Sequence, residues 1–271
     1  DADLAALFAH YYNTVDDGVI NDRWLQPSGP RNRLTDAVTS GLGELVQAAW
    51  QHLPERWKSL TFPGANHYDF NTPEYARFDE IRDKKWEATR GVGHSFGANR
   101  NERPRDIVTT TELVRMLCDV VSKNGNLLIG IGPGPDGTVP DQQVAPLRGL
   151  GDWLAVNGPA IYGTRPWDVA ATTTSEGTEV RFTCRADGTD GAEGAVHALL
   201  IDLPGRRTFT LRDVDATDVD RVALLGLDEP IGWRVTDDAR LEVTLPERLP
   251  VTAANTLVLT GRPRSTAGAT D

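Results

Sequence analysis

A helix followed directly by an apolar strand, in the middle of the chain, restricts the fold more than any other feature. Residues 109–122 predict an amphipathic helix with a threonine, Thr109 or Thr110, as its cap. Asn124 and the glycine after it end this helix, and residues 126–132 then form a continuous apolar run. Such a run is typical of a strand buried on both faces of a parallel sheet. The unit therefore predicts an α/β fold.

Other segments before residue 166 repeat the alternation of helix and strand. Apolar spacing predicts helices at 4–11, 42–53 and 147–156, and strands at 18–24 and 85–91. Residues 25–67 interrupt the pattern and are interpreted as an insertion. We expect residues 1–166 to form the C-terminal part of a (β/α) TIM-like barrel. A complete barrel needs about 250 residues, so only three or four of its units fit here.

The pattern changes near residue 167. From there on the chain shows only short alternating segments at hairpin spacing, which predict an antiparallel β-sandwich over 167–271. The predicted strands are 179–184, 196–201, 208–211, 221–225, 240–245 and 256–260. This region contains no cluster of acidic, histidine and arginine residues, so we expect a separable domain without catalytic residues.

Charge and composition exclude several classes of partner. The net charge of -11 opposes binding to nucleic acid or to an anionic membrane, because nothing offsets the repulsion by phosphate. The sequence has no run of 18 apolar residues that could cross a bilayer. The cysteines, Cys118 and Cys184, are interpreted as buried free thiols.

The sequence offers no cofactor or metal motif that withstands inspection. Residues 132–137 fit the spacing of a dinucleotide-binding loop, but Pro133 and Pro135 lack the N–H groups that would hold phosphate. The five histidines show no metal-ligand spacing. We expect neither a cofactor nor a metal.

A series of short strings, taken in order, carries a family resemblance. They are Leu7-Phe-Ala-His-Tyr-Tyr-Asn13, Asn21-Asp-Arg-Trp24, Asp69-Phe-Asn-Thr-Pro-Glu-Tyr75, Trp86-Glu87, Gly93-His-Ser-Phe-Gly97, Asn99-Arg-Asn-Glu102, Leu113-Val-Arg-Met-Leu117, Asp119-Val-Val-Ser-Lys-Asn-Gly-Asn-Leu-Leu128 and Gly132-Pro followed by Asp136-Gly-Thr138. With these strings the chain resembles the glycoside hydrolase family 29 α-L-fucosidases from residue 4 to about 168. The resemblance implies a retaining exo-hydrolase that releases terminal α-L-fucose from oligosaccharides or glycoconjugates, without metal or organic cofactor.

Glu74 matches the acid/base position of that family. Retaining hydrolysis requires two carboxyl groups about 5–5.5 Å apart, one as nucleophile and one as acid/base. The aromatic neighbours Tyr68, Phe70 and Tyr75 could desolvate the carboxyl group and favour its protonated form, as a general acid needs. An isolated loop glutamate is usually an ordinary surface residue, and only the surrounding motif favours the catalytic interpretation.

Four further residues are candidates for binding substrate. Arg23 matches a family arginine near the nucleophile, and the alternative is an ion pair with Asp22 or Asp69. Phe96 matches an aromatic wall against the sugar methyl group, with core packing as the alternative. His67 and Tyr68 could border the leaving-group side.

The resemblance places the nucleophile and several sugar-binding histidines before residue 1. The chain begins without an initiator Met, inside the helix at 4–11, so we expect an upstream N-terminal half as its partner. The alternative function is a non-catalytic carbohydrate-binding or interaction protein derived from such an enzyme. The compartment, cytoplasmic or secreted, and the oligomeric state, including a homo-oligomer, stay open.

Overall fold

The computed structural model describes residues 2–24, 68–185, 194–249 and 252–267. The chain divides into two compact units, Asp1–Thr72 and Pro73–Asp271. The predicted insertion at 25–67, with its helix at 42–53, lies outside the described residues. Within the described part of the chain, no helix is both long and apolar enough to cross a bilayer.

The first unit contains the helix α1 (Ala2–Thr14) and the short 3-10 helix η1 (Asp22–Trp24). The strand predicted at 18–24 is wrong, because only an isolated bridge between Asn21 and Phe70 forms there. The Asp22 carboxylate accepts hydrogen bonds from the Thr72 amide, at 2.9 Å, and from its hydroxyl, at 2.6 Å. These side-chain bonds occupy groups that would otherwise join a ladder, which favours a turn over a strand.

A parallel pair of strands opens the second unit. The strands β1 (Trp86–Gly91) and β2 (Gly125–Gly130) run side by side, with Trp86 opposite Gly125. A Cβ atom on Gly125 would lie 2.5 Å from the Trp86 ring, so only glycine fits at this position. The indole of Trp86 also donates to the Lys123 carbonyl at 2.9 Å, which connects the first residue of β1 to the residues just before β2.

Two helices accompany this pair, the first packed against β2 and the second packed against the first. The helix α4 (Thr110–Ser122) begins at a capping box, in which the Thr109 hydroxyl accepts from the Glu112 amide at 3.2 Å and the Glu112 carboxylate accepts from the Thr109 amide at 2.7 Å. The helix α5 (Asp141–Asn157) begins at Asp141 rather than at the predicted 147. Short 3-10 helices η2 (Pro104–Asp106) and η3 (Gly158–Ala160) complete the helical elements between 73 and 163.

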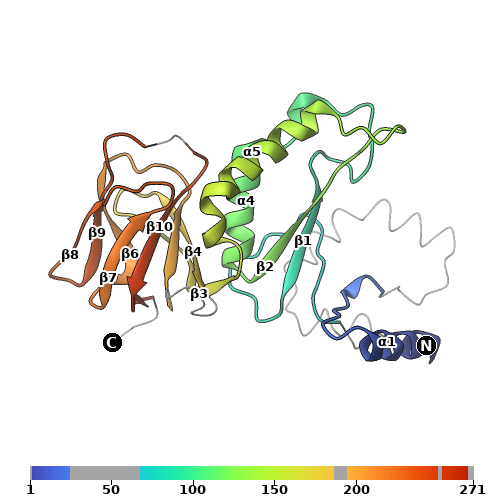
Figure 1. Cartoon of the computed structure of the whole chain (residues 1–271), viewed down its shortest axis with the longest axis horizontal. Coiled ribbons are helices and arrows are strands. Elements are labelled where there is room, and N and C mark those ends of the chain that lie inside the picture. Colours follow the sequence, from blue (N-terminus) through green and yellow to red (C-terminus); the bar gives the residue numbers. More distant parts are fainter. Residues whose placement is uncertain (1, 25–67, 186–193, 250–251, 268–271) are drawn as a thin grey trace. The chain divides into compact units, whose positions relative to one another are not determined.

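The remaining strands form two antiparallel sheets (Figure 1). The five-stranded sheet has the order β3 (Thr164–Thr173), β4 (Glu179–Arg185), β5 (Val196–Leu200), β10 (Asn255–Gly261) and β7 (Val219–Leu224). The four-stranded sheet has the order β11 (Arg264–Ser265), β6 (Thr208–Asp215), β9 (Arg240–Thr244) and β8 (Gly232–Val235). Each predicted strand after residue 167 has a counterpart, whereas β3, β8 and β11 were not predicted.

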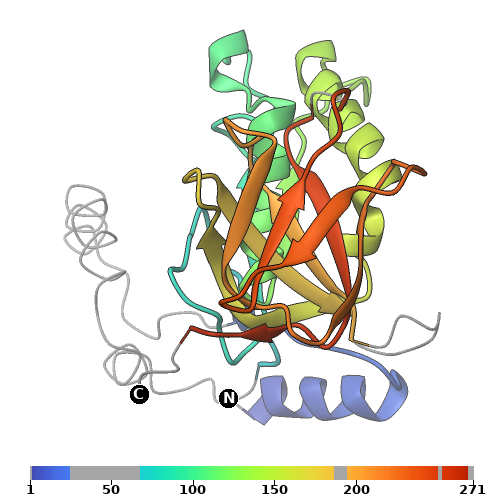
Figure 2. The ribbon, with the colours of Figure 1, turned by 90° about the vertical axis from the view of Figure 1, so that its left-hand side faces the viewer.

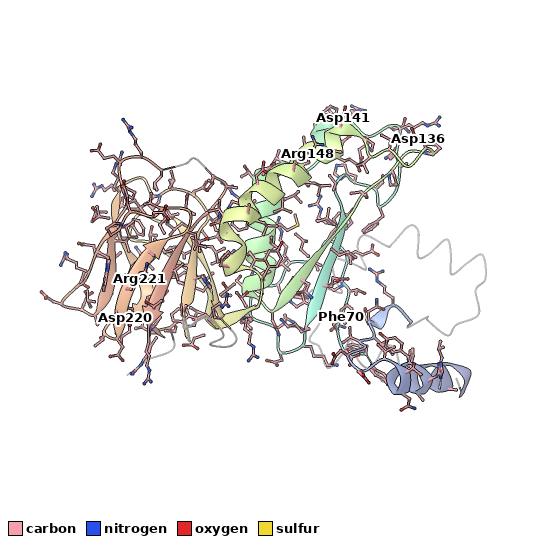
Figure 3. All side chains as sticks on the ribbon, in the orientation of Figure 1. Phe70, Asp136, Asp141, Arg148, Asp220 and Arg221 are labelled. Carbon is pink, nitrogen blue, oxygen red and sulfur yellow. The ribbon has the colours of Figure 1, made fainter. Side chains whose placement is uncertain are left out.

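Alternating side chains build the core between the two sheets. Fully buried residues that meet there include Phe182, Phe209, Leu241 and Leu257. Asp220 and Arg221, consecutive residues of β7, are both exposed, so the alternation is interrupted there (Figure 3). The region is therefore an antiparallel sandwich, as its sequence pattern predicts.

The outer face of the five-stranded sheet is buried as well, because α4 and α5 pack against it (Figures 1 and 2). Leu199 lies in one apolar cluster with Trp153 of α5. The Trp153 indole donates to the Ala254 carbonyl at 2.8 Å, and the Thr256 hydroxyl donates to Asn157 at 2.8 Å. The sandwich therefore shares a buried face with helices that precede residue 166, which alters the expectation that it is separable. The boundary at 166 stays a prediction.

An ionic network joins α4 to β4. Asp119 accepts a hydrogen bond from Lys123 at 2.6 Å and forms an ion pair with Arg181 at 2.9 Å, and Arg181 also pairs with Glu179. Lys123 and Arg181 are both largely buried, so each needs this carboxylate partner. Loss of Asp119 would remove the carboxylate that Lys123 and Arg181 share, and Arg181 would keep only its pair with Glu179.

His197 on β5 gives the sandwich a pH dependence. The side chain is buried, and burial, together with Arg185, lowers the pKa of His197 from 6.5 to about 4. The unfolded chain therefore binds a proton more readily than the folded chain between these values. The stabilising effect is complete above pH 6.5 and is lost as pH falls towards 4.

We expect the free energy of unfolding to fall by about 3 kcal/mol over this range through His197 alone, at ~1.4 kcal/mol for each pKa unit. Urea unfolding of the wild type and of His197→Gln at pH 7 and pH 4 measures the effect. His10→Gln, at an exposed histidine, is the matched control. Identical pH dependence in wild type and His197→Gln would contradict the expectation.

Candidate active site

Glu74 lies beside β1 on a short parallel segment. The Thr89 amide donates to the Pro73 carbonyl at 3.1 Å, and the Tyr75 amide donates to the Thr89 carbonyl at 3.0 Å. Glu74 and Thr89 thus form a parallel bridge. Both main-chain groups of Thr89 are used by this segment, so β2 lies on the other side of β1.

This position suits a functional carboxyl group. Thr89 is close to the C-terminal end of β1, where α/β proteins build their active sites from strand ends and the loops that follow them. The Glu74 side chain is exposed in the described structure. Its desolvation by neighbouring aromatic residues stays a prediction for the complete site.

Phe96 lies at the same ends of the strands. It belongs to the loop after β1, and its Cδ1 atom would be 3.4 Å from a Cβ placed on Gly130, the last residue of β2. The ring is 46% exposed. It meets the Tyr75 ring edge to face, with the centroids 5.7 Å apart. Core packing therefore does not account for Phe96. Its contact with Tyr75 places it near Glu74, the residue that precedes Tyr75 in the chain.

A buried amide fixes the loop that carries Phe96. The Gln143 side chain of α5 accepts from the Gly132 amide at 2.9 Å and donates to Glu102 at 3.3 Å. The other carboxylate oxygen of Glu102 accepts from the His94 amide at 2.9 Å. Gln143 is only 3% exposed, so these bonds satisfy a buried group and join the loops after β1 and β2. The sequence did not signal Gln143, because the first turn of α5 was not predicted.

The predicted substrate residues of the first unit have a different surrounding. The Arg23 guanidinium donates to the Thr72 hydroxyl at 2.8 Å and to the Thr72 carbonyl at 2.9 Å. Tyr68 is half-buried, and His67 lies outside the described residues. The structure therefore brings Phe96 close to the Glu74 segment through Tyr75, whereas Arg23 and Tyr68 belong to a unit whose position relative to Glu74 is not determined.

The same unit orders the start of the motif around Glu74. The Tyr12 hydroxyl donates to the Asp69 carboxylate at 2.6 Å, and the Ile20 amide donates to the same oxygen at 2.7 Å. The hydrogen bond to Asp69 raises the pKa of Tyr12 to about 12. Asp69 therefore acts as a local anchor of the Asp69–Tyr75 string.

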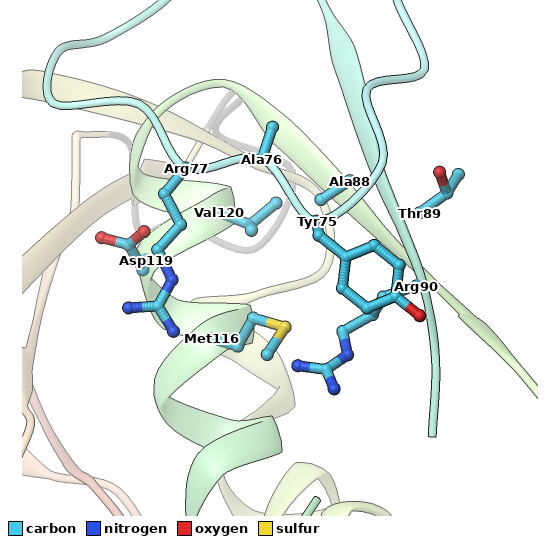
Figure 4. Close-up of a pocket in the computed structure, with 9 residues that line it drawn as sticks. All are labelled: Tyr75, Ala76, Arg77, Ala88, Thr89, Arg90, Met116, Asp119 and Val120. Carbon is cyan, nitrogen blue, oxygen red and sulfur yellow. The ribbon is translucent and has the colours of Figure 1, made fainter. Parts of the chain in front are cut away.

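A small pocket lies behind the Glu74 segment, on the α4 side of β1. Its volume is about 110 Å³, and Tyr75, Arg77, Arg90 and Met116 are among its lining residues (Figure 4). Burial lowers the pKa of Arg90, although Tyr75 and Glu112 oppose this shift. Glu74 does not line this pocket. We therefore do not interpret the pocket as the substrate site.

The described residues contain no group of three or more His, Cys, Asp or Glu side chains that could hold a metal ion. What the arrangement offers is an accessible carboxyl group and an aromatic wall at the ends of parallel strands. A carboxyl group so placed can transfer a proton to or from a bound substrate.

Comparisons with known proteins agree on one family. Residues 44–159 match the family model described as alpha-L-fucosidase. The alpha-L-fucosidase of Dictyostelium discoideum is 29% identical over 75% of this chain, and that of Branchiostoma floridae is 32% identical over 61% of it. A crystal structure of Thermotoga maritima alpha-fucosidase in complex with a mechanism-based inhibitor is 33% identical, covers 95% of this chain and superimposes with a TM-score of 0.72.

In each of these comparisons the chain spans about half of the longer relative or less. It covers 48% of the Dictyostelium protein, 35% of the Branchiostoma protein and 49% of the Thermotoga chain. The match includes the Glu74 segment, β1, α4, β2 and α5, because these elements fall within residues 44–159.

Proposed function

Since this chain belongs to the α-L-fucosidase family, we propose that it forms the part of a retaining exo-α-L-fucosidase that holds the acid/base residue. The observation that carries the proposal is the place of Glu74. Thr89 of β1 forms main-chain hydrogen bonds with the residues before and after Glu74, and the Tyr75 ring contacts the exposed ring of Phe96. An acid beside an apolar wall matches a 6-deoxy sugar whose leaving oxygen must be protonated.

Glu74 has two roles in this proposal. In the first step it donates a proton to the glycosidic oxygen while a nucleophilic carboxylate bonds to the anomeric carbon and the alcohol leaves. In the second step Glu74 removes a proton from water, which attacks the same carbon and releases fucose. One carboxyl group thus serves as acid and then as base.

The other predicted residues bind the sugar. Phe96 contacts the methyl group, and Arg23 orients the nucleophile or a sugar hydroxyl, with Thr72 as its anchor. His67 and Tyr68 border the leaving group. The substrate is a fucosylated oligosaccharide or glycoconjugate.

An N-terminal half supplies the nucleophile and completes the fold. Among the described residues of the second unit, the segment of Glu74, β1 and β2 run parallel, far fewer than the eight strands of a closed (β/α) barrel. We propose that residues 1–166 form the C-terminal part of the barrel, with 167–271 as the sandwich domain.

A panel of aryl glycosides tests the substrate assignment. The complete polypeptide should hydrolyse 4-nitrophenyl α-L-fucoside about 100-fold faster than 4-nitrophenyl α-L-galactoside, which differs only by a hydroxyl at C6, because that hydroxyl would lie against Phe96 without a hydrogen-bond partner. Equal rates would contradict a fucose site. Sugar binding without any turnover would favour the non-catalytic alternative.

A further inference from the structure

Tyr75, the residue after Glu74, has an uncommon backbone conformation. Its φ angle is +52°, in the left-handed region that bulky side chains rarely adopt. Strain of this kind persists only where the surroundings over-determine the conformation, and it gathers at functional sites. The ring is 44% exposed, so burial of the side chain does not explain why the strain is kept.

Main-chain hydrogen bonds hold the strained turn on either side of Glu74. One bond joins the Thr89 amide to Pro73, and the other joins the Tyr75 amide to the carbonyl of the same threonine. The peptide units before and after Glu74 are therefore fixed to a single residue of β1. These two hydrogen bonds, called the clamp below, fix the position of the Glu74 Cα atom and the direction of its side chain.

The phenol of Tyr75 adds a second attachment. Its hydroxyl accepts from the Gly91 amide at 3.3 Å and donates to the His94 carbonyl at 3.3 Å. These groups lie at the end of β1 and at the start of the loop that carries Phe96. The Tyr75 side chain thus connects the turn at Glu74 to the first residues of that loop.

Two neighbours hold the ring itself. The Arg90 guanidinium lies over it, 5.4 Å from the centroid, and Phe96 meets it edge to face. Figure 4 shows the Tyr75 ring and the Arg90 side chain together at one side of the pocket. The ring therefore has neighbours on the strand and on the loop, and none of these contacts uses Glu74 itself.

We propose that Tyr75 is a positioning residue: its strained turn and its phenol fix the Glu74 carboxyl group relative to the Phe96 wall. The inference rests on the proposed function, because it assumes that Glu74 transfers protons. Proton transfer depends on alignment, and a misplacement of about 1 Å can cost about 10²-fold in rate, so a loosened Glu74 segment should impair the acid more than the binding of the sugar.

Tyr75→Phe in the complete polypeptide tests the phenol, because it keeps the ring and removes only the hydroxyl. We expect kcat/KM for an alkyl fucoside, a poor leaving group, to fall by about 10-fold, and kcat/KM for a 2,4-dinitrophenyl fucoside to change less than about 2-fold, because kcat/KM reports the step that cleaves the glycosidic bond. For the alkyl fucoside the fall should lie in kcat, with KM nearly constant. Tyr162→Phe, the same change at an exposed tyrosine, is the control and should have no effect.

Tyr75→Asn keeps the left-handed backbone conformation but removes the ring and its hydroxyl. Asparagine accepts the left-handed conformation but cannot reach Gly91 and His94. We expect at least as large a loss on the alkyl fucoside, together with faster hydrogen exchange of the Gly91 amide. Exchange at Gly91 needs no activity, so it reports the clamp directly.

Two outcomes would overturn the inference: equal losses on both leaving groups, which a purely structural role would give, or full activity of Tyr75→Phe. Glu74→Gln, measured in parallel, separates this failure from failure of the proposed function. If Glu74→Gln discriminates between the leaving groups and Tyr75→Phe does not, only the positioning role is lost. If Glu74→Gln has no effect, the acid/base assignment itself is wrong.

Discussion

Replacing Glu74 by Gln in the complete polypeptide should lower kcat for natural fucosides by about 10²- to 10⁴-fold, the usual contribution of a general acid. The amide cannot protonate the glycosidic oxygen. The fold should stay intact, because Glu74 is exposed and its segment is held by main-chain bonds. In kcat/KM, which reports cleavage of the glycosidic bond, the loss should be smaller for a 2,4-dinitrophenyl fucoside, whose leaving group needs little protonation.

Steady-state kinetics on both substrates measures this difference. Glu80→Gln is the matched control, because Glu80 is also an exposed glutamate a few residues along the chain. It should have wild-type activity. An equal loss of kcat/KM on both substrates with Glu74→Gln would assign the residue a structural role and would leave the acid unidentified.

The second large effect concerns the nucleophile. We expect the 271-residue chain by itself to show no turnover of an aryl α-L-fucoside, because retaining hydrolysis needs a second carboxylate that our proposal places in the N-terminal half. Supplying that half, in the same polypeptide or in trans, should restore activity. The rise should exceed about 10³-fold, because the missing group forms the covalent intermediate.

Size-exclusion chromatography should accompany this assay, because an open parallel edge favours association. Activity of the isolated chain would contradict the proposal and would require a nucleophile within it. Glu102 is a poor candidate for that role, since its carboxylate already binds the His94 amide and the buried Gln143.

Local signals decided which elements could be predicted. The helix α4 has a capping box and an apolar stripe, and β2 is a continuous apolar run, so both were found from the sequence. The start of α5 was missed because Pro146 lies within it and its first turn has few apolar residues. The strand β3 was missed because Pro166 and Asp168 interrupt its alternation.

Tertiary contacts account for the rest. The strand predicted at 18–24 is replaced by a turn, because Asp22 finds partners on Thr72, about fifty residues away. No local sequence pattern predicts such a long-range hydrogen bond. The burial of the outer sheet face is equally non-local, since Leu199 meets Trp153 only after the sandwich and α5 have packed.

The candidate site was predicted in part, and by resemblance more than by pattern. Glu74 and Phe96 were named from motifs, whereas the clamp around them depends on a backbone angle at Tyr75 that no motif contains. Gln143 contributes through an element whose start was not predicted. Candidates that depend on side-chain identity could therefore be named from the sequence, whereas contacts that depend on backbone conformation could not.

The most direct test of the acid/base assignment is the product formed by Glu74→Ala in the presence of azide. Without a general base, water attacks the fucosyl-enzyme intermediate slowly, but azide needs no deprotonation and can enter the vacated space. We expect azide to accelerate turnover of 2,4-dinitrophenyl α-L-fucoside by this variant, with α-L-fucosyl azide, of retained configuration, as the product identified by NMR. The β-azide, or no azide product at all, would contradict the assignment of Glu74 as the acid/base of a retaining fucosidase.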